Sequence, residues 1–174
     1  MAQKIQEEIG MNKKKETAIF LLKLLVLSIP LYIFMWIGID LSFLQEITTN
    51  SVISSLRLLG IETSREGFNI SAQGFLFHIS PDCTGWKGML FLFSLIMSTK
   101  SNWGKKIIGI FATIPSFFSF NVLRILLMVQ IGLGDTRTFE LLHDFLWQFS
   151  MVAVVLLLWL IWARSDINIL GVKK

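Results

Sequence analysis

The residues with the clearest capacity for chemistry lie in one stretch, Ser80-Pro81-Asp82-Cys83-Thr84-Gly85-Trp86-Lys87-Gly88. It holds the only cysteine of the chain, where a polar, turn-rich segment meets an apolar one. Pro81 removes a backbone donor and restricts the residue before it, so we predict that a new helix starts at about residues 82–84. The positive end of that helix, with Lys87 one turn further on, favours the thiolate form of Cys83. Two interpretations stay open, a catalytic thiolate and a buried structural thiol.

A second polar group lies inside an apolar stretch, Phe120-Asn121-Val122-Leu123-Arg124-Ile125-Leu126-Leu127. Asn121 and Arg124 are three residues apart, so they share one face of a helix. A charged side chain within a membrane helix is costly and is by default functional. Its planar guanidinium is suited to orient a carbonyl or to stabilise an oxyanion. The alternative is a structural ion pair with Asp144 or Asp82.

His143 begins the last apolar run of the sequence, where an imidazole can exchange protons near neutral pH. An ordinary interfacial histidine is the alternative. His78 is a rival for the same role, although strand alternation turns it away from the face of its neighbours. The sequence contains no Gly-rich phosphate loop, no GxSxG elbow and no Cys/His metal cluster. We therefore expect a site without metal or cofactor.

Composition indicates what kind of protein positions these residues. Of the 174 residues 53% are hydrophobic and only 16% are charged, and the mean hydropathy is +0.65. Soluble domains carry more charge. The apolar residues form four runs, at about 18–39, 83–99, 107–133 and 141–163, which we expect to span a bilayer. The sequence thus predicts an all-α polytopic membrane protein, with residues 1–174 forming a single domain.

The third apolar run and the segment between the first two runs have distinct predicted structures. The third run is predicted to be one helix, bent or broken near Pro115 and Ser116. Between the first two runs, Leu41 to Leu59 has the spacing of an amphipathic helix on the outer face, ended by Gly60. The segments 68–70 and 75–79 then predict a short β-hairpin around residues 71–74, which leads the chain to Cys83.

The distribution of charge predicts the orientation in the membrane. Three basic residues lie in the segments on the side of the membrane opposite the N-terminus, namely Arg57, Arg65 and Arg137. Many more lie on the same side of the membrane as the N-terminus, namely Lys4, Lys13, Lys14, Lys15, Lys100, Lys105, Lys106, Arg164, Lys173 and Lys174. The positive-inside rule then places both termini in the cytoplasm and Cys83, Arg124 and His143 near the outer face. This asymmetry also explains the basic pI, so we expect no nucleic-acid partner.

These motifs have a counterpart in a known family. Asp82-Cys83-Thr84-Gly85-Trp86-Lys87, then Asn121-Val122-Leu123-Arg124, and then His143 resemble the exosortase/archaeosortase family over roughly residues 40–163. The Asp-Cys-Thr-Gly-Trp-Lys motif is similar to that of archaeal members. The resemblance implies that Cys83, Arg124 and His143 are catalytic, and we expect Asp82, Lys87 and Asn121 to bind substrate or support them.

The resemblance also implies a membrane cysteine protease or transpeptidase without a cofactor. Its substrates would be surface proteins whose C-terminal tail combines a recognition motif, a transmembrane helix and a basic cluster. Cleavage through a thioester would occur at the outer face of the cell membrane, followed by transfer to an acceptor. The rival prediction is a non-enzymatic four-span accessory or transport protein in which Arg124 lines a polar path. The motif, the acceptor and the oligomeric state are left open by the sequence.

Overall fold

The computed structural model describes the backbone of residues 2–134 and 136–165, and the side chains of residues 12, 14–134 and 149–165. This part of the chain is mostly helical. In chain order its elements are α1 (Ala2–Ile37), α2 (Ser42–Leu58), β1 (Thr63–Glu66), β2 (Asn69–Ala72), β3 (Phe75–His78), the 3-10 helix η1 (Pro81–Thr84), α3 (Trp86–Ser98), α4 (Trp103–Gly134) and α5 (Thr136–Arg164).

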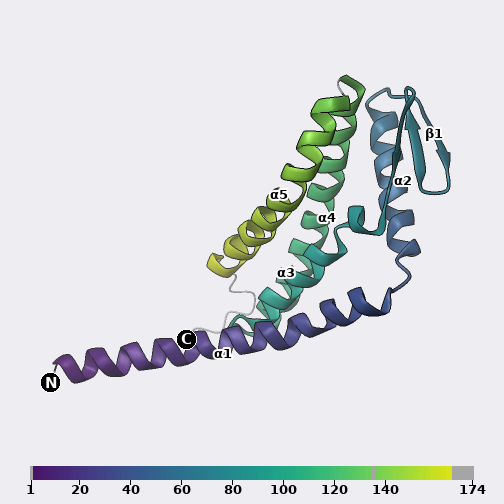
Figure 1. Cartoon of the computed structure of the whole chain (residues 1–174). Helices are drawn as coiled ribbons and strands as arrows, with labels where there is room; N and C mark the ends of the chain where they lie inside the picture. The colour runs from purple at the N-terminus through teal and green to yellow at the C-terminus, as the bar shows by residue number, and fades with distance from the viewer. Residues whose placement is uncertain (1, 135, 166–174) are drawn as a thin grey trace.

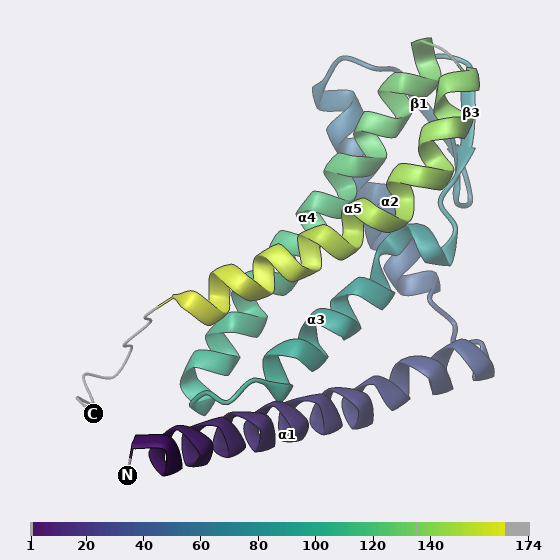
Figure 2. The same ribbon diagram turned by 60° about the vertical axis from the view of Figure 1, so that its left-hand side comes forward.

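The helices α1, α3, α4 and α5 approach one another at one end of the molecule (Figures 1 and 2). We call this the closed end. Lys106 donates to the carbonyl of Met97 at 2.7 Å, and Lys105 donates to the carbonyl of Ala163 at 3.1 Å. Cations at helix C-termini complement the unpaired carbonyls and the helix dipole. Lys106 therefore fastens the last turn of α3 to α4, and Lys105 does the same for α5.

Away from the closed end, α1 diverges from α4 and α5, and α3 lies in the wedge between them (Figure 2). The spread end, which carries η1, is called the open end. Phe20 of α1 stacks on Trp159 of α5 with ring centroids 6.1 Å apart, on the side of the closed end. The wedge is filled by a buried cluster consisting of Leu92, Leu95, Ile96, Phe117, Val155 and Trp162.

A second buried cluster joins α2 and the sheet to the open half of α4. Its members include Val52, Leu56, Ile70, Ile79, Val122, Ile125, Val129 and Cys83. Gly132 of α4 allows a close approach, since a Cβ there would lie 2.4 Å from the ring of Phe75. Arg65 of β1 pairs with Glu46 of α2, and this ion pair holds the pKa of the Glu46 carboxyl below its ordinary value.

The sheet corrects the predicted hairpin. Three antiparallel strands are present in the order β1-β2-β3, and β2 and β3 form the predicted pair. Their connection is tighter than predicted, because only Gln73 and Gly74 lie between the strands, both with positive φ, 46° and 88°. Such two-residue turns match the twist of paired strands. β1 was missed because its sequence, Thr-Ser-Arg-Glu, carries no apolar alternation.

The predicted start of a helix at residues 82–84 is wrong. Those residues belong to η1, and α3 starts only at Trp86. Gly85 separates the two with φ of 75°, a left-handed conformation that L-residues with a Cβ rarely adopt. Cys83 therefore lies outside the first turn of α3, in a short helix of its own.

The predicted membrane segments agree in part with the helices. Among the described residues two helices are long and apolar enough to cross a membrane, Lys14–Ile37 and Trp103–Gly134. Trp86–Ser98 and Phe149–Arg164 are shorter apolar helical segments, so the count of four spans stays a prediction. α4 continues through Pro115 without a break in its helical backbone. α2 matches the predicted helix within a residue, although Gln45, Thr48 and Thr49 share its buried face with apolar residues.

The contact of α3 with α4 at Gly88 yields a stability prediction. An alanine Cβ at position 88 would lie 2.2 Å from Cζ of the fully buried Phe117 ring. Overpacking of this kind costs about 1–3 kcal/mol, so Gly88→Ala should lower the thermal midpoint of the detergent-solubilised protein. Gly104→Ala is the matched control, because its Cβ would meet nothing closer than 3.8 Å. Equal midpoints for the two variants would contradict this packing.

Candidate active site

Two residues, Ile79 and Ser80, connect the end of β3 to the 3-10 helix η1. Ser80 is in extended conformation and Pro81 follows it, in the first position of the helix, where its missing donor is tolerated. The amide of Cys83 donates to the carbonyl of Ser80 at 3.0 Å, and the hydroxyl of Thr84 donates to the carbonyl of Pro81 at 2.7 Å. These bonds form a compact single turn that carries the only cysteine.

The thiol of Cys83 is enclosed but not fully covered, with 9% of the residue exposed. Its Sγ lies 3.1 Å from Oγ of Ser80 and 4.0 Å from the carbonyl oxygen of His78. A hydroxyl can donate to a thiolate as well as accept from a thiol. Ser80 was not singled out in the sequence, although its position three residues before Cys83 in a turn is a usable signal.

Two neighbouring helices hold this turn in place. Nδ2 of Asn121, on α4, donates to the carbonyl of Cys83 at 2.7 Å, and Asn121 is fully buried. Nε2 of Gln45, on α2, donates to the carbonyl of Ile79 at 2.9 Å. Gly85 packs directly against α4, since a Cβ there would lie 3.1 Å from Cγ of Asn121. The sequence singles out Asn121 within an apolar helix, but Gln45 does not stand out among the polar residues of an amphipathic helix.

Arg124 lies one turn beyond Asn121 on the same face of α4 and is 9% exposed. Its guanidinium and the Cys83 side chain are close enough to interact electrostatically. Asn121 and Arg124 both line a cavity of about 500 Å³, together with Asp82 and Gly85. We call it the lateral cavity. The structure thus brings together Cys83, Asn121 and Arg124, which the sequence selected from two separate segments.

Asp82 and Lys87 contact each other. Oδ1 of Asp82 lies 2.8 Å from Nζ of Lys87. The same Nζ lies 5.8 Å from the ring centre of Trp86. Lys87 was predicted to act on the thiol, but its ammonium is engaged by the Asp82 carboxylate. The predicted alternative, an ion pair between Arg124 and Asp82, would have to compete with Lys87 for the same carboxylate.

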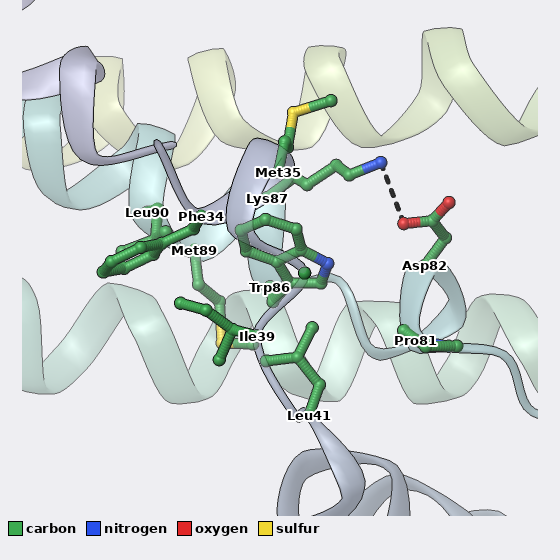
Figure 3. Close-up of a pocket in the computed structure, with 11 residues that line it drawn as sticks. Phe34, Met35, Ile39, Leu41, Pro81, Asp82, Trp86, Lys87, Met89 and Leu90 are labelled. Atoms are coloured by element: carbon green, nitrogen blue, oxygen red, sulfur yellow. Dashed lines mark ion pairs between the residues drawn. The ribbon is translucent and has the colours of Figure 1, made fainter. Parts of the chain in front are cut away.

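The Asp82–Lys87 pair lies between two cavities. Both residues line the lateral cavity, and both also line a cavity of about 540 Å³ between α1 and α3. We call the second one the α1–α3 cavity. Figure 3 shows the ion pair beside the apolar side chains of this second cavity, among them Phe34, Met35 and Met89. Two separate spaces therefore meet at the residue that precedes Cys83.

The structure describes the side chain of His78 but not that of His143. The ring of His78 is exposed, and its Nδ1 lies 2.8 Å from Oδ1 of Asn69 on β2. His78 thus contributes its carbonyl, and not its ring, to the surroundings of the thiol. His143 lies in α5, and its side chain, like that of Asp144, is outside the described residues. Within the described part of the chain no cluster of three His, Cys, Asp or Glu side chains is arranged to hold a metal ion.

The fold and the site together define a mostly helical protein with two helices long and apolar enough to cross a membrane, and with an enclosed cysteine beside an arginine of one of them. Comparison with known families agrees with this class. Residues 12–166 match the family described as transmembrane exosortase, so the chain belongs to that family and is a membrane protein. The predicted family resemblance is thereby confirmed. No curated protein and no solved structure gives a significant match.

The hydrogen bond from Asn121 to Cys83 yields a prediction for thiol reactivity. Asn121→Ala removes the donor and leaves a buried carbonyl unsatisfied, at a cost of about 1–3 kcal/mol. Opening of the turn should then become more frequent, and maleimide should label Cys83 in detergent about tenfold faster, as a change of about 1.4 kcal/mol implies. No other cysteine interferes with the measurement.

Ser119→Ala is the matched control for this experiment. Oγ of Ser119 donates to the Pro115 carbonyl of the same helix at 3.0 Å, and among the described side chains it bonds no other element. Its labelling rate should equal that of the wild type. If Asn121→Ala also labels at the wild-type rate, Asn121 does not restrain the turn.

Proposed function

We propose that this exosortase-family protein is a membrane cysteine peptidase or transpeptidase with Cys83 as its nucleophile. The observation that carries the proposal is the contact between η1 and α4. The turn bearing the only cysteine is bonded to Asn121, and Arg124, one helical turn further, lines the lateral cavity and is close enough to the cysteine for an electrostatic interaction. A nucleophile, a fixed cation and space for a ligand are the parts that acyl transfer needs.

The proposed reaction has two steps. The Cys83 thiolate attacks the scissile carbonyl, and Arg124 donates hydrogen bonds to the oxyanion that develops. His143 gives a proton to the leaving amine as the C–N bond breaks, which leaves a thioester on Sγ. Water or an amine then attacks the thioester, with His143 accepting its proton, and Cys83 leaves as thiolate.

The proposed substrates are surface proteins with a C-terminal recognition motif, a transmembrane helix and a basic cluster. Transfer of the new C-terminus to an acceptor requires that a second molecule reaches the same thioester. The α1–α3 cavity supports this part of the proposal, because it meets the lateral cavity at the Asp82–Lys87 pair.

We further propose four spans with both termini in the cytoplasm and Cys83 facing outside. What supports this orientation is that Lys105 and Lys106 bond across the closed end and Lys100 follows the last turn of α3, whereas η1 precedes the first turn of α3. A membrane-impermeant maleimide should label Cys83 in intact cells. Labelling only after permeabilisation would reverse the orientation.

Replacement of Cys83 tests the covalent mechanism. The probe is a secreted reporter fused to the C-terminal tail of a surface protein from the same cell, with an epitope tag at each end. Cys83→Ala should insert normally and leave the reporter at full length, because a methyl group cannot attack a carbonyl. Cys83→Ser should fail as well, since an alcohol is far harder to deprotonate than a thiol.

The outcome separates the two classes of function. Immunoblotting of both tags reports cleavage, and an immunoblot of the membrane fraction reports insertion of each variant. Normal processing by Cys83→Ala would eliminate thiol catalysis. The accessory or transport function, with Arg124 lining a polar path, would then take its place.

Arg124→Lys tests whether processing needs the planar guanidinium of Arg124 or only its positive charge. Lysine keeps the charge but loses the planar fork, so processing of the reporter should fall about a hundredfold or more, as when an oxyanion donor is removed. Arg57→Lys is the control, because Arg57 is exposed on α2 and its Nε donates to Thr63 at 3.2 Å, away from both cavities. Wild-type processing by Arg124→Lys would reduce Arg124 to a generic positive charge.

A further inference from the structure

The lateral cavity has walls from opposite sides of the wedge. Leu31 of α1 lines one side, and Met151, Val152 and Val155 of α5 line the other. α1 and α5 are linked through the stacked rings of Phe20 and Trp159 towards the closed end. Towards the open end the helices diverge, as Figures 1 and 2 both show. The cavity thus occupies the gap between the C-terminal part of α1 and the middle of α5.

The mouth of this gap is apolar and exposed. Val152 is 54% exposed while it lines the cavity, so the cavity reaches the surface of α5. On the face turned away from Leu31, α1 also presents exposed apolar side chains such as Leu25, Ile29 and Ile33. In a membrane protein such a surface faces lipid. A ligand that enters here comes from within the bilayer.

The inner end of the cavity is polar and incompletely bonded. Nδ2 of the fully buried Asn121 is used by the Cys83 carbonyl, but in the described part of the chain its Oδ1 has no hydrogen-bond partner. A buried acceptor without a donor costs about 1–3 kcal/mol. A ligand with an N–H or O–H group at this position would remove that cost. A lipid acyl chain has no such donor, whereas a peptide backbone has one in every residue except proline.

We infer that the gap between α1 and α5 is a lateral portal through which a membrane-anchored polypeptide reaches the active site. The apolar flank of its transmembrane helix lies against Leu31 and Val152. The chain unwinds at its outer end, a backbone N–H donates to Oδ1 of Asn121, and a neighbouring carbonyl lies between Cys83 and Arg124. This inference rests on the proposed function and names how that substrate binds.

Photo-crosslinking tests the portal without requiring turnover. A photoreactive phenylalanine analogue replaces Val152 in the full chain carrying Cys83→Ala, which is co-expressed with the double-tagged tail reporter in intact cells. The matched control carries it at Leu157, which is 55% exposed on the same helix but does not line the cavity. Irradiation should join the reporter to position 152 and not to position 157.

A second pair of variants measures the consequence for processing in the chain with Cys83 intact. Val152→Trp narrows the portal, and a substrate misplaced by about 1 Å can lose about a hundredfold in rate, so processing should fall at least about tenfold. Leu157→Trp should process the reporter at the wild-type rate. Immunoblots of the membrane fraction check that both variants are inserted in equal amounts.

The outcomes separate the two proposals. Crosslinks at 157 as strong as at 152, or wild-type processing by Val152→Trp, would overturn the portal and leave the proposed function standing. Crosslinks to lipid alone at position 152 would also overturn it. If wild-type protein never cleaves the reporter, the proposed function fails, and a crosslink confined to position 152 would still support the portal as a binding site.

Discussion

The position of the thiol depends on one hydrogen bond, from Nδ2 of Asn121 to the carbonyl of Cys83. η1 is a single turn between a strand and a helix, and its own bonds are too few to fix it relative to the membrane helices. The bond to α4 sets the position of the thiol relative to Arg124, because Asn121 and Arg124 are one turn apart on a continuous helix. The rigid backbone of α4 therefore fixes the position of the Cys83 thiol relative to Arg124.

The rest of the fold maintains that contact from both sides. Gly85 and Gly88 let the start of α3 approach Phe117 and Asn121 more closely than any residue with a side chain would allow. Gln45 ties the segment before η1 to α2. Lys105 and Lys106 close the opposite end of the bundle. A wedge that is closed at one end and occupied by α3 leaves open space at the other end, where Cys83 lies.

The residues that the sequence selected and the structure brings together are those whose chemistry conflicts with their surroundings. Arg124 and Asn121 stand out because an apolar helix has no other use for them, and Cys83 because it is the only thiol of the chain. Local backbone conformation was harder to foresee. The left-handed Gly85 moved the start of α3 from the predicted residues to Trp86, and a proline signal alone does not specify where a helix resumes.

Partners within the site were also beyond sequence reasoning. Lys87 pairs with Asp82, and Ser80 approaches the thiol, through tertiary geometry that residue spacing does not determine. Gln45 and β1 were missed because polar residues on a helix or an edge strand are usually solvated. The family match over residues 12–166 confirms the class of protein, while the roles of Cys83, Arg124 and His143 stay predictions.

The most direct test of the central claim is mass spectrometry of the Cys83 peptide during turnover. Wild-type membranes are mixed with the tail reporter, quenched in acid at successive times and digested. The account predicts that Cys83 transiently carries the reporter fragment that ends at the cleavage site, as a thioester that hydroxylamine removes. A reporter that is fully processed while the Cys83 thiol carries no adduct at any quench time would contradict the account.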